Sequence, residues 1–110
     1  MSKKLRVIIT ESAKLDVRSI RDHIARDRLL AARRWVQELQ RRGRALASMP
    51  AFEIIPEADE IGAPFRHVVF KNYRIIYHVS PTQVTVERVI HGARRLTRDL
   101  LKPPPPPPEG

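Results

Sequence analysis

The chain has 110 residues, 42% of them hydrophobic, which is the usual size of one domain and enough for a two-layer core. It has no cysteine, so disulfides and thiolate metal sites are excluded, and no apolar run approaches the roughly 20 residues of a membrane-spanning helix. The apolar stretch at the start of the chain, within MSKKLRVIIT, is too short for a signal peptide. We therefore expect a cytoplasmic protein without a membrane partner. The net charge of +9 favours an anionic partner, such as RNA, DNA or an acidic protein segment, over a basic surface that is merely solvated.

The first half of the chain predicts a strand followed by a helical hairpin. Residues 5–9, LRVII, are short and rich in β-branched side chains, which is typical of a strand. Thr10 or Ser12 can then cap a helix. Its apolar residues have helical spacing: Ala13, Val17, Ile20 and Ile24. A second arginine-rich helix begins near Leu29 and ends at Pro50.

The second half predicts a loop and then three strands. Residues 50–64 contain three prolines and a glycine, and their stretch 51–60 carries four acidic residues and no basic one. The apolar period then changes to two in the segments 65–70, 73–79 and 83–91. Lys71 and Asn72 form a two-residue loop, in which Asn72 tolerates a positive φ. We therefore expect an α+β fold: an N-terminal strand and a helical hairpin, followed by an antiparallel three-stranded meander, with the helices on one sheet face.

The two-residue loop fixes which side chains share a face. It pairs Phe70 with Tyr73, Val68 with Ile75, Arg66 with Tyr77, Val69 with Arg74 and His67 with Ile76. In the last strand, Val84, Val86 and Ile90 are expected in the core, with Val89 on the polar side. The prediction is one exposed face that carries His67, Arg74, His78, Glu87 and His91 beside the basic run Arg94, Arg95 and Arg98. Two interpretations stay open: an ordinary solvated sheet face, on which Arg74 and Glu87 form a cross-strand ion pair, or a concave basic sheet that holds a phosphodiester or a peptide.

Other site chemistries have little support in the sequence. The three histidines of this face include no close pair and no neighbouring carboxylate cluster, so no metal is expected. No serine lies in a nucleophile turn, and the chain lacks a glycine-rich phosphate loop. We expect no cofactor.

The C-terminal end divides into a docked segment and a tail. Residues 93–101 predict a short helix or an extended tail that docks through Leu96, Leu100 and Leu101. Residues 103–110, which begin with six prolines, predict a polyproline II tail outside the folded domain of residues 1–102. Such a tail is a ligand for a proline-recognising domain, a spacer, or a segment without a role in the core activity.

The element order, the segment YRIIY (73–77) and the segment HGARR (91–95) resemble the RelE/ParE superfamily of bacterial type II toxin–antitoxin toxins. The resemblance covers residues 5–101. In the RelE-like branch, which cleaves messenger RNA on the ribosome without metal, it implies catalytic roles for Arg74 and Arg94, with Arg66 near a lysine position. The C-terminal tyrosine of that branch is absent here, since LTRDLLK follows Arg95, and His91 is then the candidate acid or base.

The HGAR segment, the leucine-rich end and the long arginine-rich helices are more similar to the ParE-like branch. This similarity implies a toxin that inhibits growth by binding DNA gyrase and trapping its cleaved DNA complex. The target- or phosphate-binding candidates are Arg66, His67, Arg74, His78, His91, Arg94 and Arg95. In either branch a cognate antitoxin is the implied partner, and we expect it to dock on the helical hairpin and the sheet edge. A basic nucleic-acid-binding domain without toxicity stays open as a third alternative.

Overall fold

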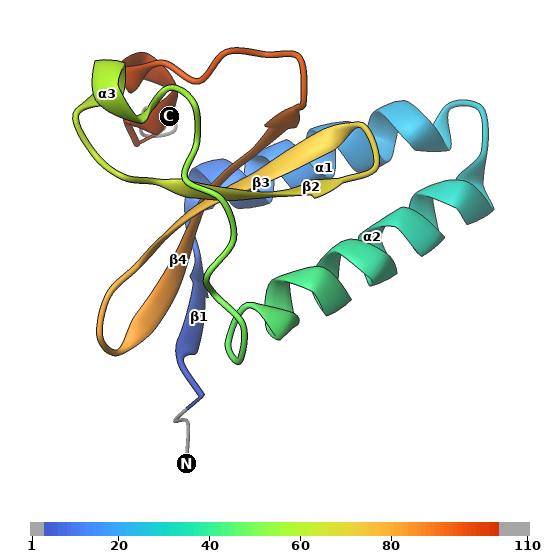
Figure 1. Ribbon diagram of the computed structural model, residues 1–110. Helices are drawn as coiled ribbons and strands as arrows, with labels where there is room; N and C mark the ends of the chain where they lie inside the picture. Colours follow the sequence, from blue (N-terminus) through green and yellow to red (C-terminus); the bar gives the residue numbers. More distant parts are fainter. Residues whose placement is uncertain (1–3, 104–110) are drawn as a thin grey trace, which may run out of the picture.

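The computed structural model describes residues 4–103 and has the predicted α+β order of elements (Figure 1). The elements are β1 (Arg6–Ile9), α1 (Glu11–Ala25), α2 (Leu29–Ala45), α3 (Ala58–Ile61), β2 (Arg66–Phe70), β3 (Tyr73–Val79), β4 (Gln83–His91) and a 3-10 turn, η1 (Arg98–Leu101). Helix α2 ends before Pro50, and a short helix, α3, lies inside the predicted loop. The proline tail from residue 104 onward lies outside the described residues.

The helical hairpin begins at a capped helix and buries the predicted stripes. Thr10 is the N-cap of α1, and its Oγ1 accepts a hydrogen bond from the backbone N of Ala13 at 3.1 Å. In α2, Trp35 is 3% exposed and its ring lies 5.9 Å from that of Phe70 and 5.5 Å from that of Tyr73. The arginines of α2 lie on its exposed side. The amphipathic pattern therefore fixes which side of the hairpin meets the sheet.

The four strands form one sheet in the order β1-β4-β3-β2. Strand β1 pairs with β4 in parallel, and the other two pairs are antiparallel, as expected for the predicted meander. The hairpin of β2 and β3 has the predicted register, with Phe70 opposite Tyr73 and Val69 opposite Arg74. Its positive φ falls on Lys71, at 54°, and not on Asn72.

A β-bulge in β4 changes the predicted faces of the last strand. Ile76 pairs with Arg88 but Tyr77 pairs with Val86, so Glu87 is the additional residue. The alternation of side chains shifts by one position after it. Val89 therefore packs in the main core and Ile90 on the opposite face, which corrects the prediction that placed Ile90 in the core and Val89 outside it.

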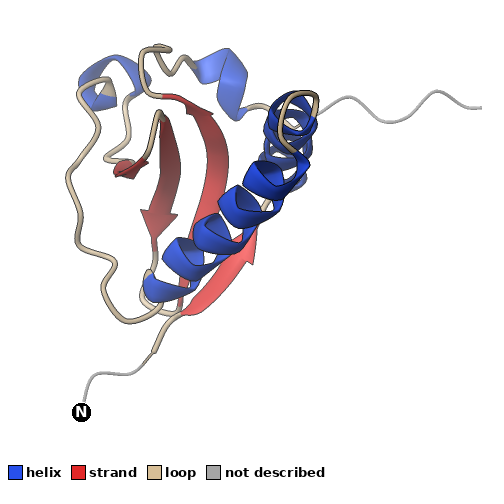
Figure 2. Cartoon of the chain, turned by 90° about the vertical axis from the view of Figure 1, so that its right-hand side faces the viewer, coloured by secondary structure: helices blue, strands red, loops and turns tan. Residues whose placement is uncertain are grey.

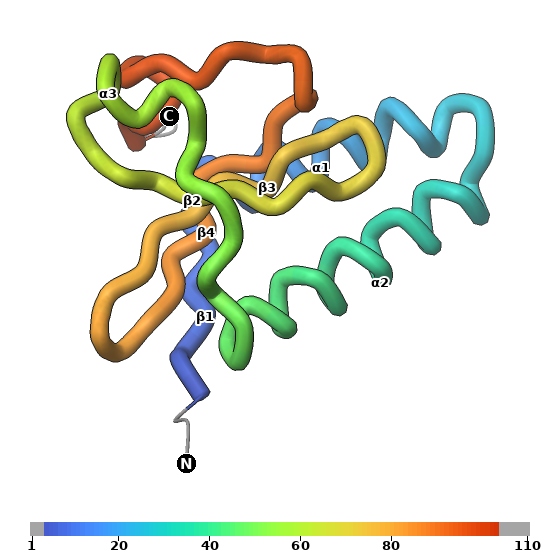
Figure 3. Tube along the Cα trace, in the orientation of Figure 1, coloured from blue at the N-terminus to red at the C-terminus, as the bar shows by residue number. Residues whose placement is uncertain are grey.

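The helical hairpin covers one face of the sheet, and α3 with the neighbouring loops covers part of the other (Figure 2). The hairpin and the sheet share the main core, which contains Ala13, Trp35, Leu39, Leu46, Val68, Phe70, Ile75, Tyr77, Val84, Val86 and Val89. A second apolar cluster lies on the other face and contains Ile55, Ile76, Ile90 and Leu96. It is formed where α3 and the residues after β4 come together above the sheet (Figure 3). Leu96 is 1% exposed, so the segment after β4 docks through this leucine as predicted.

Candidate functional site

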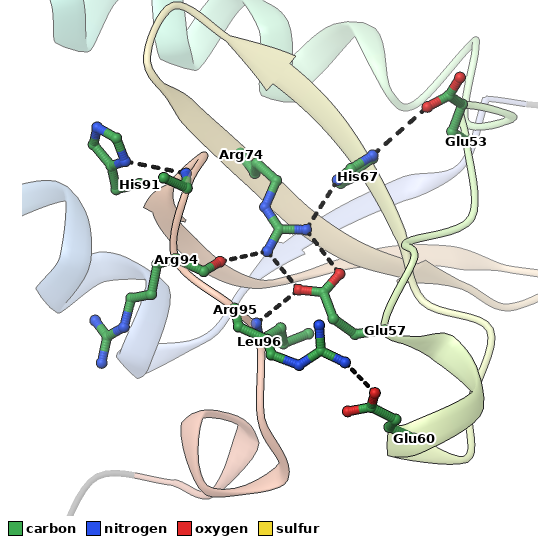
Figure 4. Close-up of polar contacts among 10 residues, drawn as sticks. Glu53, Glu57, Glu60, His67, Arg74, His91, Arg94, Arg95 and Leu96 are labelled. Carbon is green, nitrogen blue, oxygen red and sulfur yellow. Dashed lines mark hydrogen bonds and ion pairs between the residues drawn. The ribbon is translucent and has the colours of Figure 1, made fainter.

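Arg74 is the second residue of β3, and its guanidinium makes four hydrogen bonds (Figure 4). Nη1 donates to Glu57 Oε1 at 3.1 Å and Nη2 donates to Glu57 Oε2 at 2.7 Å. Nη2 also donates to the backbone O of Arg94 at 2.7 Å, and Nη1 lies 3.2 Å from His67 Nδ1. Arg74 is 5% exposed, which corrects the prediction that it lies on an exposed face.

Glu57 is the acidic partner of this arginine. It is 2% exposed, and its Oε2 also accepts a hydrogen bond from the backbone N of Leu96 at 2.7 Å. The hydrogen bonds from Arg74 lower the pKa of Glu57 to about 2, although burial acts in the opposite direction. The carboxylate is therefore charged at neutral pH. It holds three segments together: the acidic stretch 51–60, β3 and the residues after β4.

The cross-strand pair of Arg74 with Glu87, which an ordinary solvated face would carry, does not form, because each side chain has another partner. Glu87 lies 2.9 Å from His78 Nε2, and His78 also packs edge-on against Phe65, with ring centroids 5.6 Å apart. Both contacts lie on the same side of β3 as Arg74. His78 and Glu87 therefore form a separate polar pair, apart from the Arg74 network.

The histidines predicted for one face are divided between two. His67 lies beside Arg74 with a side chain only 11% exposed, and burial and the nearby guanidinium lower its pKa, so the ring is neutral at pH 7. His91 pairs with Tyr73 on the face of the helical hairpin, and their rings lie 5.7 Å apart. The prediction that His91 shares a face with Arg74 is wrong, and the bulge at Glu87 is the reason.

The predicted arginines have three different environments. Arg66 is partly buried and donates to the backbone O of Phe52. Arg94 and Arg95 are exposed in the segment of residues 92–102, which we call the C-terminal segment. Arg95 forms an exposed ion pair with Glu60, and Figure 4 shows the side chain of Arg94 directed away from Arg74. The structure thus brings His67, Arg74 and the backbone of Arg94 together, but not Arg66, His78 or His91.

The acidic stretch 51–60 is the part of this site that sequence reasoning missed. Its signal was visible as four acids without a base. Two of them pair with arginines, Glu57 with Arg74 and Glu60 with Arg95, and Glu53 lies 3.8 Å from His67. The backbone of the stretch also runs along the edge of β2, where His67 N donates to Glu53 O at 3.0 Å. The stretch therefore supplies the acidic partners of Arg74 and Arg95.

A family model for the ParE toxin of type II toxin–antitoxin systems, parDE, matches residues 7–96. The chain belongs to the ParE toxin family. The matched range includes the whole Glu57–Arg74–Leu96 network. Membership in a toxin–antitoxin family implies an antitoxin partner.

A solved structure with low sequence identity supports the fold. The chain is similar to a chain of the chromosomal ParDE toxin–antitoxin system from P. aeruginosa, with 15% identity and a TM-score of 0.66. The match covers 82% of this chain and 98% of the other. No curated protein matched the sequence.

Two structural findings concern the described residues 4–103 alone. No helix among them is long and apolar enough to cross a membrane. No three histidine, aspartate or glutamate side chains of this range come together as a metal site.

Proposed function

We propose that this ParE-family chain inhibits bacterial growth by binding DNA gyrase and trapping its cleaved DNA complex, and that its antitoxin neutralises it. The observation that carries the proposal is the burial of Arg74, the arginine that the RelE-like branch would use at the scissile phosphate. Four of its N–H groups are already bound to Glu57, His67 and the backbone of Arg94. Binding a phosphate there would require breaking a buried ion pair, which is costly.

The other candidates for ribonuclease chemistry do not converge on Arg74. His91 lies on the hairpin side of the sheet, in contact with Tyr73. Arg94 offers Arg74 its carbonyl oxygen, while its side chain is exposed. General acid–base catalysis requires its groups within hydrogen-bond reach of the same reacting atoms. This dispersal supports a toxin that acts by binding its target.

The gyrase proposal is tested with the purified full-length chain. We expect gyrase supercoiling to be inhibited and cleaved DNA to accumulate when the toxin is added. Unaffected supercoiling at an excess of toxin would overturn the proposal. In parallel, primer extension on translated messages reports ribonuclease activity, and codon-phased cuts that disappear in Arg74→Ala would favour the RelE-like alternative.

The antitoxin-binding part of the proposal rests on a groove between the two long helices. The groove encloses about 520 Å³, and its floor is formed by apolar side chains of β1, β3, β4 and the helices. Lys14, Arg18 and Arg44 line it as basic residues. An apolar floor with basic residues beside it fits an amphipathic segment that carries acids next to its apolar anchors.

Gly43 supports the entry of a partner at this groove. It lines the groove within α2, where glycine costs up to about 1 kcal/mol relative to alanine. Within the described residues, a Cβ at this position would meet no atom within 4 Å, so packing of the chain on itself does not require glycine. A partner whose backbone crosses α2 closely at this point would require it.

The groove is tested by measuring antitoxin affinity of the Gly43→Gln variant, with Ala45→Gln as a control on the same helix outside the groove. We expect Gly43→Gln to bind the antitoxin at least about tenfold more weakly, a loss of about 1.4 kcal/mol in binding free energy. The affinity of the control should be unchanged. Equal affinity of the two variants would contradict docking at the groove.

A further inference from the structure

The outer side of α2 carries a row of four exposed arginines, Arg33, Arg34, Arg41 and Arg44, which we call the arginine row. Among residues 4–103, none of them has an acidic partner within ion-pair distance. The acid of the same helix, Glu38, contacts Lys71 instead, at 3.4 Å. The row is therefore an uncompensated strip of positive charge, which should attract an anion.

The row lies on one side of its helix. At about 100° per residue its four members fall within an arc of about 100°, opposite the buried Trp35 and Leu39. Arg33 and Arg44 are separated along the axis by about 17 Å at about 1.5 Å per residue. Since successive phosphates of one strand rise by about 3.4 Å along the duplex axis, a row of this length is long enough to meet more than one phosphate.

We propose that the arginine row binds the phosphate backbone of duplex DNA without sequence preference. Arginine is suited to this partner because its planar guanidinium donates two parallel hydrogen bonds to a phosphate. The contacts would neutralise phosphates and release counterions, which makes the binding strongly dependent on salt. This activity goes beyond gyrase inhibition and needs no gyrase to be measured.

One feature favours a duplex over single-stranded nucleic acid. Single strands are bound by aromatic side chains on which bases stack, but Trp35 of this helix is 3% exposed and faces the core. Four guanidinium groups without a stacking group suit a regular backbone of phosphates. A protein partner is the competing occupant, because Leu29 and Leu30 are exposed at one end of the row and Arg44 lines the apolar groove.

The proposal is tested by fluorescence anisotropy with the full-length chain and a labelled DNA duplex of random sequence. Affinity is measured between about 50 and about 200 mM salt, where phosphate contacts have a large effect. The variant Arg33→Gln/Arg34→Gln/Arg41→Gln leaves the groove-lining Arg44 in place. Its salt slope should fall by about 2 to 3, at about 0.9 per lost contact, and its affinity at low salt by at least about tenfold.

The matched control, Lys4→Gln/Arg6→Gln/Lys102→Gln, removes the same charge from exposed positions outside the hairpin. It should retain nearly the wild-type slope. Equal slopes for the two triple variants would show that only net charge matters and would overturn the proposal. The proposal would also be overturned if the variant Arg33→Gln/Arg34→Gln/Arg41→Gln bound DNA normally but no longer bound the antitoxin, because the row would then be a protein contact. Single-stranded DNA, measured in parallel, should bind more weakly, and a preference for it would also overturn the proposal.

Discussion

Glu57 and Arg74 form a buried ion pair with two hydrogen bonds, of 3.1 and 2.7 Å, on the sheet face away from the helical hairpin. The same two side chains bind the backbone N of Leu96 and the backbone O of Arg94. The pair therefore joins three segments that are distant in sequence: the acidic stretch 51–60, β3 and the C-terminal segment. Because both partners are almost fully buried, each compensates a charge that would otherwise be costly.

Removing one partner of this pair should strongly destabilise the chain. In Glu57→Gln the guanidinium of Arg74 stays buried without its counter-charge, and in Arg74→Met the carboxylate does. We expect each variant to lose about 3 to 5 kcal/mol of unfolding free energy, measured by urea denaturation. The double variant Glu57→Met/Arg74→Met leaves no unpaired charge and should lose less than the sum of the two single variants.

The exposed pair of Glu60 with Arg95 provides the control for this prediction. Their side chains are 67% and 59% exposed, so Glu60→Gln should change the unfolding free energy by less than about 1 kcal/mol. If Glu57→Gln is as mild as Glu60→Gln, the buried pair does not stabilise the fold as argued.

The same pair should make stability depend on pH in the acidic range. The pKa of Glu57 is about 2 in the folded chain against an ordinary 4.5. Between these values the unfolded chain binds the proton and the folded chain does not, so stability is complete above pH 4.5 and falls as pH approaches 2. The full loss lies between about 3 and 4 kcal/mol, at about 1.4 kcal/mol per pKa unit. The measurement is urea denaturation of wild type and Glu57→Gln from pH 6 to about 2.5. In the lower part of this range Glu57 is protonated in the unfolded chain but not in the folded one. The difference in unfolding free energy between the two should shrink as pH falls, and a constant difference would contradict the assignment.

The element order and the hairpin register were predictable, but the contacts that depend on the β-bulge and on the acidic stretch 51–60 were not. A two-residue loop determines its own register, so the pairing of Val69 with Arg74 followed from the sequence. The bulge at Glu87 has no clear local signal, and it alone moved His91 to the other face. Glu57 lies 17 residues from Arg74 in a loop with little periodicity, and only the folded chain shows that they meet. The burial of Arg74 was missed for the same reason.

Two glycines of the chain should respond in opposite ways to alanine. Gly43 lies inside α2 with open space at its Cβ position, so Gly43→Ala should raise the unfolding free energy by up to about 1 kcal/mol. Gly62 ends α3 with φ at 82°, a left-handed conformation in which alanine is strained, so Gly62→Ala should lower it by about 1 kcal/mol. Thermal unfolding of both variants measures this. A destabilised Gly43→Ala would mean that α2 needs glycine for its own packing.

Arg88 holds the far end of the C-terminal segment, and its replacement by lysine should loosen only that end. Arg88 binds Asp16 through Nε and Nη2, both at 2.7 Å, and its Nη1 donates to the backbone O of Leu100 at 2.7 Å. Lysine retains the charge but has no planar fork with which to make all three bonds. In Arg88→Lys we therefore expect hydrogen exchange of the Leu100 and Lys102 amides, which are bonded within the 3-10 turn, to accelerate about tenfold, corresponding to about 1.4 kcal/mol. The Leu96 amide should keep its protection because Glu57 still binds it. Faster exchange at all three amides would show that the segment opens as one unit, and unchanged exchange at Leu100 would show that Arg88 does not hold it.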